Sequence, residues 1–176
     1  EVISGGYVYS FDGELLWTVG DGFSAVANFD DDDYAEVVVV TNGQVQVFNH
    51  DGTPYWSNSK SIYGGGSGGA PTIADFDGDG KTDILVASFF PTDITESLIL
   101  FTNQSTSEVA FEPTQFAHAN KGRWMVMQDG DIDQDGDIDV VLGSFISGPS
   151  HLKGMILNKW IKESVDLLIL RNQREQ

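Results

Sequence analysis

The 176-residue sequence has no cysteine, which excludes disulfide bridges, thiol chemistry and zinc–thiolate sites. Basic residues are scarce: 9 lysines and arginines stand against 27 aspartates and glutamates, and the formal net charge is −18. This charge argues against nucleic acids and anionic membrane surfaces as partners, because both repel an acidic protein. No apolar run reaches the roughly 18 residues that a spanning helix needs, so no membrane insertion is expected.

Patterns typical of catalysis are also missing. The three histidines, His50, His118 and His151, are scattered. None is placed relative to a serine or an acid in a way that suggests a nucleophile or a proton relay. The obvious pairs of carboxylates, which glycosidase chemistry would need, all lie inside three acidic loops. We therefore expect neither an enzyme nor an organic cofactor site.

The acidic residues are concentrated in three strings of nine residues. They read N-F-D-D-D-D-Y-A-E (28–36), D-F-D-G-D-G-K-T-D (75–83) and D-I-D-Q-D-G-D-I-D (131–139), with Asp, Asn or Glu at positions 1, 3, 5 and 9 of each. So many carboxylates in nine residues repel one another unless a cation lies among them. A hard divalent ion takes 6–8 oxygen ligands, and calcium tolerates the irregular geometry of such a loop better than magnesium does.

The predicted ligands are the side chains at positions 1, 3, 5 and 9 and the main-chain carbonyl at position 7. They are Asn28, Asp30, Asp32, Tyr34 and Glu36 in the first loop; Asp75, Asp77, Asp79, Lys81 and Asp83 in the second; and Asp131, Asp133, Asp135, Asp137 and Asp139 in the third. The first loop departs from the others at both ends, and Asp33 replaces a glycine whose position usually has positive φ, which Asp tolerates better than most residues. We expect two to three calcium ions, the first loop binding more weakly.

These loops differ from EF-hands, which end in a bidentate glutamate at position 12 and lie between helices. Position 12 here would be Val39, Val86 or Leu142, none of which can bind a cation. Apolar, β-branched runs precede and follow each loop, so the expected unit is a β-hairpin held by a metal.

The arrangement in which D-x-D-x-D-G-x-x-D lies between two strands resembles the FG-GAP/VCBS repeat, the calcium-loop blade of integrin-α-type β-propellers. The stretches G-G-A-P-T-I-A-D-F-D-G-D-G-K-T-D-I-L-V-A-S (68–88) and G-D-I-D-Q-D-G-D-I-D-V-V-L-G-S-F (130–145) carry the resemblance most clearly. It covers roughly residues 1–145 and implies an all-β fold: a partial β-propeller of about three to three and a half four-stranded blades.

Further repeats indicate how the single propeller segment 1–176 divides. Asp-Gly followed by Trp occurs at 12–17 and 51–56, where hairpins and inter-blade tryptophans are expected. L-I-L-F-T-N-Q (98–104) echoes L-I-L-R-N-Q (168–173), which indicates third strands that end in a turn led by Asn. We assign residues 1–20 to the outer strands of one blade, and 21–60, 66–118 and 122–176 to blades around the three acidic loops. Residues 150–163 fit either a short helix or an extended insertion.

The resemblance implies a secreted or cell-surface calcium-binding module with a structural, adhesion or recognition role and a protein or glycan ligand. Extracellular calcium, which is millimolar, suits such loops, and the chain, which opens on Glu1, is expected to be a processed or excerpted piece. Two alternatives stay open: a propeller module of a larger secreted carbohydrate-active enzyme, and a self-assembling fibre or surface-layer subunit. Self-association, or continuation in a longer chain, is expected to complete the propeller.

Overall fold

The computed structural model describes residues 1–30, 32–58, 69–88, 98–116, 124–144 and 167–170. Within these ranges the fold is all-β, and no helix long and apolar enough to cross a membrane occurs there. The expected segment 150–163 and most of the glycine-rich stretch 64–69 lie outside the described residues. The strands form small antiparallel sheets in which each strand pairs with its neighbour in sequence.

Four such sheets follow one another along the described chain. The first contains β1 (Val2–Ser4), β2 (Gly6–Tyr9) and β3 (Leu15–Gly20). The second contains β4 (Phe23–Ala27), β5 (Glu36–Thr41), β6 (Gln44–Phe48) and β7 (Pro54–Ser57). The third contains β8 (Pro71–Ala74), β9 (Asp83–Ala87), β10 (Leu98–Asn103) and β11 (Phe111–Gln115). The fourth contains β12 (Trp124–Gly130), β13 (Asp139–Ser144) and β14 (Leu167–Leu170).

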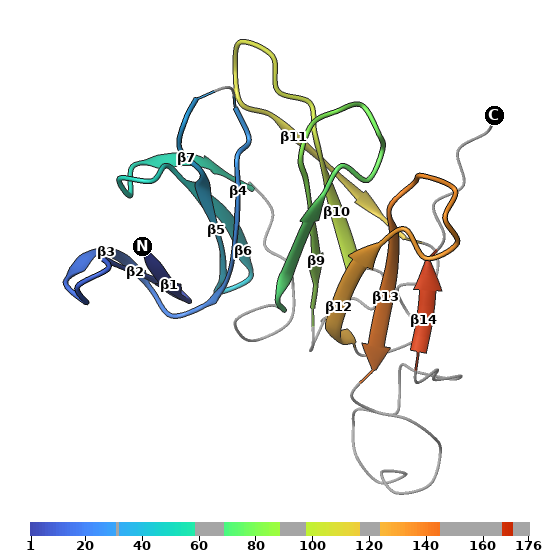
Figure 1. Cartoon of the computed structure of the whole chain (residues 1–176), viewed down its shortest axis with the longest axis horizontal. Coiled ribbons are helices and arrows are strands. Elements are labelled where there is room, and N and C mark those ends of the chain that lie inside the picture. Colours follow the sequence, from blue (N-terminus) through green and yellow to red (C-terminus); the bar gives the residue numbers. More distant parts are fainter. Residues whose placement is uncertain (31, 59–68, 89–97, 117–123, 145–166, 171–176) are drawn as a thin grey trace, which may run out of the picture.

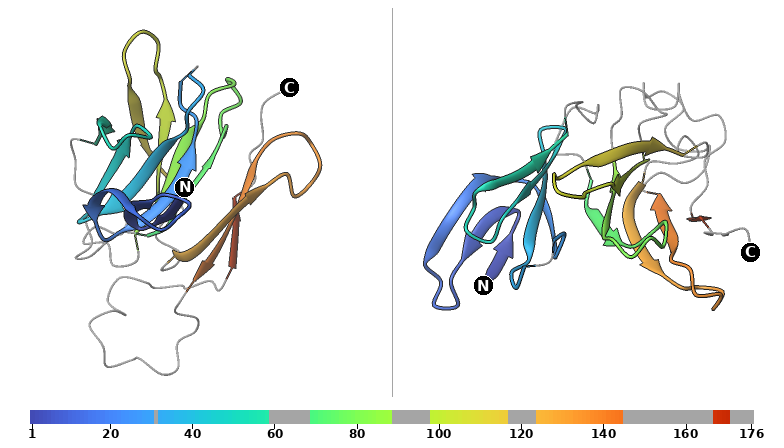
Figure 2. Two further views of the ribbon diagram at one scale, coloured as in Figure 1. Left: turned by 60° about the vertical axis from the view of Figure 1, so that its left-hand side comes forward. Right: turned by 90° about the horizontal axis from the view of Figure 1, so that it is seen from above.

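The sheets stack face to face, and apolar clusters fill the spaces between them. One cluster, with Val8 and Val39, joins the first sheet to the second. Another, with Val38 and Ile84, joins the second to the third, and a third cluster, with Leu85 and Leu142, joins the third to the fourth. Figures 1 and 2 show successive sheets turned relative to one another like blades, with β4, β8 and β12 as neighbours. The chain is a partial β-propeller.

The middle strands are apolar without alternation because both of their faces are covered. In β5, Val37 to Val40 are all at most 2% exposed, since alternate side chains enter the clusters on opposite sides of the sheet. The same holds for β9, where Ile84 and Leu85 enter different clusters. The run E-V-V-V-V is therefore a strand buried on both faces. The sequence of such a strand is continuously hydrophobic and does not alternate.

The two Asp-Gly turns close hairpins as expected. The amide of Gly13 donates to the carbonyl of Ser10 (3.0 Å) and that of Gly52 to the carbonyl of Asn49 (2.9 Å), and both glycines have positive φ, 85° and 84°. The second hairpin packs closely on the first sheet. A Cβ added to Gly52 would lie only 2.7 Å from Cγ of Trp17 in β3.

The tryptophans that follow these turns pack between sheets, which confirms the role expected of them. The ring of Trp17 lies 5.8 Å from that of Phe48, and its Nε1 donates to the carbonyl of His50 (2.9 Å). Trp56 of the second sheet packs on Phe101 and Phe111 of the third, with ring centroids 5.7 and 4.8 Å apart. The tryptophans thus help to hold consecutive sheets together.

Candidate metal centres

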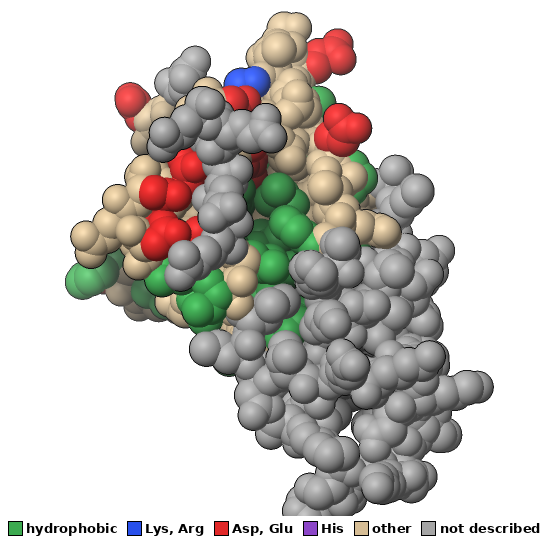
Figure 3. Space-filling view, turned by 90° about the vertical axis from the view of Figure 1, so that its right-hand side faces the viewer, with side chains coloured by type: hydrophobic (Ala, Val, Ile, Leu, Met, Phe, Trp, Pro, Cys, Tyr) green, Lys and Arg blue, Asp and Glu red, His purple; other side chains and the backbone are tan. Residues whose placement is uncertain are grey.

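The three acidic loops occupy equivalent places in three sheets. They connect β4 to β5, β8 to β9 and β12 to β13, and they lie at the same end of the molecule (Figure 1). Figure 3 shows acidic side chains gathered over this end, with hydrophobic side chains below them. The propeller topology therefore repeats one local arrangement on successive blades.

Each loop brings three carboxylates together, with one ligand atom from each lying within 4.8 Å of the others. The three clusters are Asp30, Asp32 and Glu36; Asp75, Asp77 and Asp83; and Asp131, Asp133 and Asp139. In the second and third loops these are positions 1, 3 and 9, and in the first loop they are positions 3, 5 and 9. The structure thus gathers nine of the fifteen predicted ligands into clusters, and the role of all fifteen as metal ligands stays a prediction. The six outside the clusters are Asn28, Asp79, Asp135 and the carbonyls of Tyr34, Lys81 and Asp137.

The acid at position 9 anchors each loop. It is the first residue of the second strand and is buried: Glu36 is 1% exposed, and Asp83 and Asp139 are fully buried. In every loop its carboxylate accepts a hydrogen bond from the amide of position 2. The donors are Phe29 at 2.7 Å, Phe76 at 2.9 Å and Ile132 at 3.0 Å. This bond folds the start of the loop over its end.

Several amides of the loops donate hydrogen bonds to the loops' own carboxylates. In the second loop the amide of Asp79 donates to Asp77 (3.1 Å) and that of Lys81 donates to Asp79 (2.9 Å). The amide of Asp137 in the third loop donates to Asp135 (3.0 Å) in the same way. These short-range bonds hold the chain in consecutive turns, so the acidic side chains are placed by the backbone.

Left-handed residues allow the second and third loops to turn. Gly80 and Gly136 at position 6 have φ of 89° and 94°, and their amides donate to the position 1 carboxylate, each at 3.0 Å. Position 4 is left-handed as well, at Gly78 (φ 70°) and at Gln134 (φ 64°). The left-handed conformation of Gln134 could not be predicted from the sequence, because a glutamine seldom adopts it.

The first loop turns differently, because Asp33, at the position of the left-handed glycines Gly80 and Gly136, does not have positive φ. Among the described residues, positive φ outside glycine occurs at Asn42 and Gln134. Asn28, an amide where the other loops have a carboxylate, can donate as well as accept: its Nδ2 donates to the carbonyl of Asp32 (2.7 Å), and its Oδ1 accepts from the amide of Asp30 (3.0 Å). The position 1 side chain therefore donates to the main chain in the first loop, whereas in the second and third loops it accepts from the main chain.

Two buried carboxylate oxygens in the loops have no hydrogen-bond partner among the described residues, Oε1 of Glu36 and Oδ1 of Asp75. Burial raises the pKa of Glu36, with a further contribution from the negative charges of Asp30 and Asp32. Burial likewise raises the pKa of Asp83, with a smaller contribution from Asp77. Buried acceptors without donors are costly unless a cation satisfies them. Because every candidate ligand atom in the clusters is a carboxylate oxygen, the clusters fit a hard divalent cation.

Comparison with protein families identifies a repeat in the part of the chain that holds the first two loops. The family described as FG-GAP-like repeat matches residues 28–86, from the first position of the first acidic loop to β9. This part of the chain is an FG-GAP-type repeat. Comparisons with curated proteins and with solved structures find no match.

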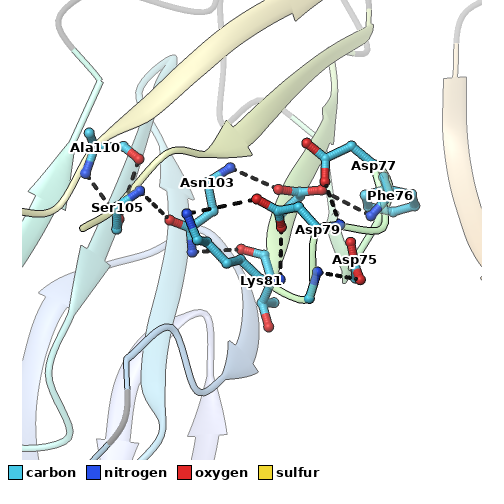
Figure 4. Close-up of polar contacts among 11 residues, drawn as sticks. Asp75, Phe76, Asp77, Asp79, Lys81, Asn103, Ser105 and Ala110 are labelled. Carbon is cyan, nitrogen blue, oxygen red and sulfur yellow. Dashed lines mark hydrogen bonds and ion pairs between the residues drawn. The ribbon is translucent and has the colours of Figure 1, made fainter.

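In the third sheet, the second acidic loop of the FG-GAP segment is tied to the neighbouring β10–β11 turn through Asn103 (Figure 4). Asn103 is 1% exposed, and its amide donates to Oδ1 of Asp83 (2.8 Å). Its side chain donates to the carbonyl of Thr82 (3.1 Å) and accepts from the amide of Ser105 (3.0 Å). The sequence signal for this residue was the Asn that leads the turn after each expected third strand.

Tyr55 lies next to the first loop of the FG-GAP segment. Burial, with the nearby carboxylates of Asp30 and Glu36, raises the pKa of Tyr55 to about 12. On the other side of this loop, the ring of Tyr34 stacks on His50 with centroids 4.1 Å apart. His50 is thus used in packing, and His118 and His151 lie outside the described residues.

Proposed function

We propose that this chain is a secreted or cell-surface, calcium-stabilised β-propeller module that recognises a protein or a glycan and has no catalytic activity of its own. The observation that carries the proposal is the pair of unpartnered buried oxygens, on Glu36 and Asp75, inside acidic clusters. A calcium ion would satisfy them and relieve the repulsion among the carboxylates. Two to three ions are proposed, in line with the three clusters.

Calcium binding is tested by calorimetric titration of the 176-residue chain. The expected result is at least two sites, with the first loop binding more weakly. Asp77→Ala and Asp133→Ala should each remove one site, because each takes an exposed carboxylate from a cluster. Glu112→Ala, which removes an exposed acid on β11, is the control and should leave the stoichiometry unchanged. Absence of binding at millimolar calcium would refute the proposal.

Self-association, or pairing with a further sheet of a longer chain, is a second proposal, and the outer face of the first sheet favours it. The register places Val2 opposite Tyr9 and Tyr9 opposite Leu15, so the three side chains form one row across the sheet. Val2 is 57% exposed and Leu15 is 52% exposed, while the opposite face, with Val8, packs on the second sheet. An exposed apolar sheet face of this kind is typical of an interface.

A further inference from the structure

A pocket of about 400 Å³ lies between the second and third sheets, at the end that carries the acidic loops. The first loop contributes Phe29 and Asp30, β7 contributes Tyr55, the second loop contributes Lys81, and the β10–β11 turn contributes residues 105–109. Its volume falls within the roughly 300–1,000 Å³ of small-molecule sites. The pocket lies beside the first carboxylate cluster, with which it shares Asp30.

Both walls of the pocket are held in place by the acidic loops. On one side, the amide of Phe29 is bonded to Glu36 (2.7 Å), and the Phe29 ring packs edge-on against Phe111 with centroids 5.6 Å apart. On the other side, Asn103 connects the β10–β11 turn to Asp83 (2.8 Å). A cation in the first loop would fix Glu36, which holds Phe29 on one wall. A cation in the second loop would fix Asp83, which holds the β10–β11 turn through Asn103 on the other wall.

The β10–β11 turn is also closed by its own hydrogen bonds. The amide of Gln104 donates to the carbonyl of Ala110 (2.8 Å), and the amide of Thr106 donates to the carbonyl of Glu108 (3.2 Å). Ser105 Oγ accepts from the amide of Ala110 (3.1 Å). Thr106 and Ser107 are exposed at the tip, so their hydroxyls are available to a ligand in a turn that is already ordered.

The chemistry of the lining suits a ligand that carries many hydroxyl groups. The hydroxyls of Thr106 and Ser107 can donate and accept hydrogen bonds, and that of Tyr55, which is hydrogen-bonded to Asp30, can still accept one. Phe29 and Val109 add apolar surface. A sugar ring combines these features, since it presents hydroxyls at its edge and C–H groups on its faces.

The charges around the pocket favour a neutral ligand. Asp30 belongs to the first carboxylate cluster, so in the cation-loaded chain its charge is balanced by the ion. Lys81 and Glu108 then remain as charged side chains in the lining, and the ammonium of Lys81 lies 3.7 Å from a carboxylate oxygen of Asp79. With the net charge of −18, anionic ligands are repelled at longer range.

We propose that this pocket binds a neutral saccharide and that binding requires cations in the first and second acidic loops. The inference rests on the proposed recognition function and names its ligand class. It places the site between two blades, with Tyr55 on one wall and the tip of the β10–β11 turn on the other.

The test uses the 176-residue chain with about millimolar calcium and immobilised saccharides: neutral oligosaccharides ending in glucose, galactose, mannose or N-acetylglucosamine, and sulfated or uronic acid counterparts. Neutral saccharides should bind, and a chelator should abolish binding. The double variant Thr106→Ala, Ser107→Ala and the variant Tyr55→Phe should each weaken binding by about tenfold, the loss expected for one or two hydrogen bonds. Thr114→Ala, which removes an exposed hydroxyl from β11 outside the pocket lining, is the matched control and should bind like the unchanged chain.

Calcium titration of the same variants separates the two proposals. Thr106 and Ser107 lie outside the loops, so their double variant should keep every calcium site. Calcium binding without binding of any neutral saccharide would overturn the pocket proposal and leave the calcium module intact. Saccharide binding that survives both pocket variants, or a preference for anionic saccharides or for peptides tested in parallel, would also overturn it. Loss of calcium binding itself would overturn both.

Discussion

At the scale of single residues, Asn103 links an acidic loop to the strand turn beside it. Its side chain accepts from Ser105 and donates to the carbonyl of Thr82 in a site that is 1% exposed. Asn103→Ala leaves two polar main-chain groups without partners, so we expect the free energy of unfolding to fall by roughly 1–3 kcal/mol. Urea unfolding measures this change, and Gln44→Ala at an exposed position of β6 is the control. A loss equal to that of the control would contradict the assigned role.

The buried acids Glu36 and Asp83 predict opposite pH dependences with and without calcium. Their pKa values are raised in the fold, so the stability they contribute without a cation is fully present below the unfolded pKa values, 4.5 for Glu36 and 3.8 for Asp83. It is lost as pH rises through the raised values. With calcium, which binds the ionised forms, the same rise in pH should add stability. Melting temperatures between about pH 4 and 7, in calcium and in chelator, test this, and parallel curves would contradict it.

For the site residues, the spacing in the sequence predicted which acids come together, while their role as metal ligands stays a prediction. The acids at positions 3 and 9 of every loop lie in the carboxylate clusters, because a nine-residue turn between paired strands leaves them few other places. The role of Asn28 as a donor to Asp32 could not be predicted, since Asn offers both a donor and an acceptor. Asn103 was visible only as a repeated turn residue, because its contact with Asp83 depends on strand pairing.

At the scale of elements, the two Asp-Gly hairpins form a natural comparison. Gly13 and Gly52 have the same backbone conformation, φ 85° and 84°, but a Cβ on Gly13 meets nothing within 4 Å, whereas a Cβ on Gly52 meets Trp17 at 2.7 Å. Gly13→Ala should cost about 1–2 kcal/mol from backbone strain alone. Gly52→Ala should cost roughly 1–3 kcal/mol more, because the added methyl forces the tryptophan out of its packing. Equal losses in urea unfolding would show that this contact does not hold the first two sheets together.

The strands that are covered on both faces could be predicted from the sequence. The runs in β5 and β9 are continuous in Val, Ile and Leu because a sheet packs on either side of them. Residues 2–20 form a sheet of three strands, and their assignment as the outer strands of a blade stays a prediction. The boundaries assigned to the blades stay a prediction.

At the scale of the whole molecule, the exposed row of Val2, Tyr9 and Leu15 predicts association. The double variant Val2→Ser, Leu15→Ser should shift the calcium-loaded chain toward the monomer, because it removes apolar surface from the proposed interface. Light scattering during size-exclusion chromatography measures the mass. Ser4→Ala at the same strand is the control, and a chain that is monomeric without any substitution would contradict self-association.

The central claim is that the acidic loops bind cations that hold the propeller blades together, and thermal unfolding with calcium and with a chelator tests it most directly. A ligand that binds only the folded state at 100 times its Kd adds about 2.7 kcal/mol per site. Two filled sites would therefore raise the melting temperature by roughly 10–20 °C for a chain of this size, and the triple variant Asp30→Asn, Asp77→Asn, Asp133→Asn should lose most of that rise. A calcium-dependent rise that the triple variant lacks is the result we predict, and identical melting curves in calcium and in chelator would contradict the account.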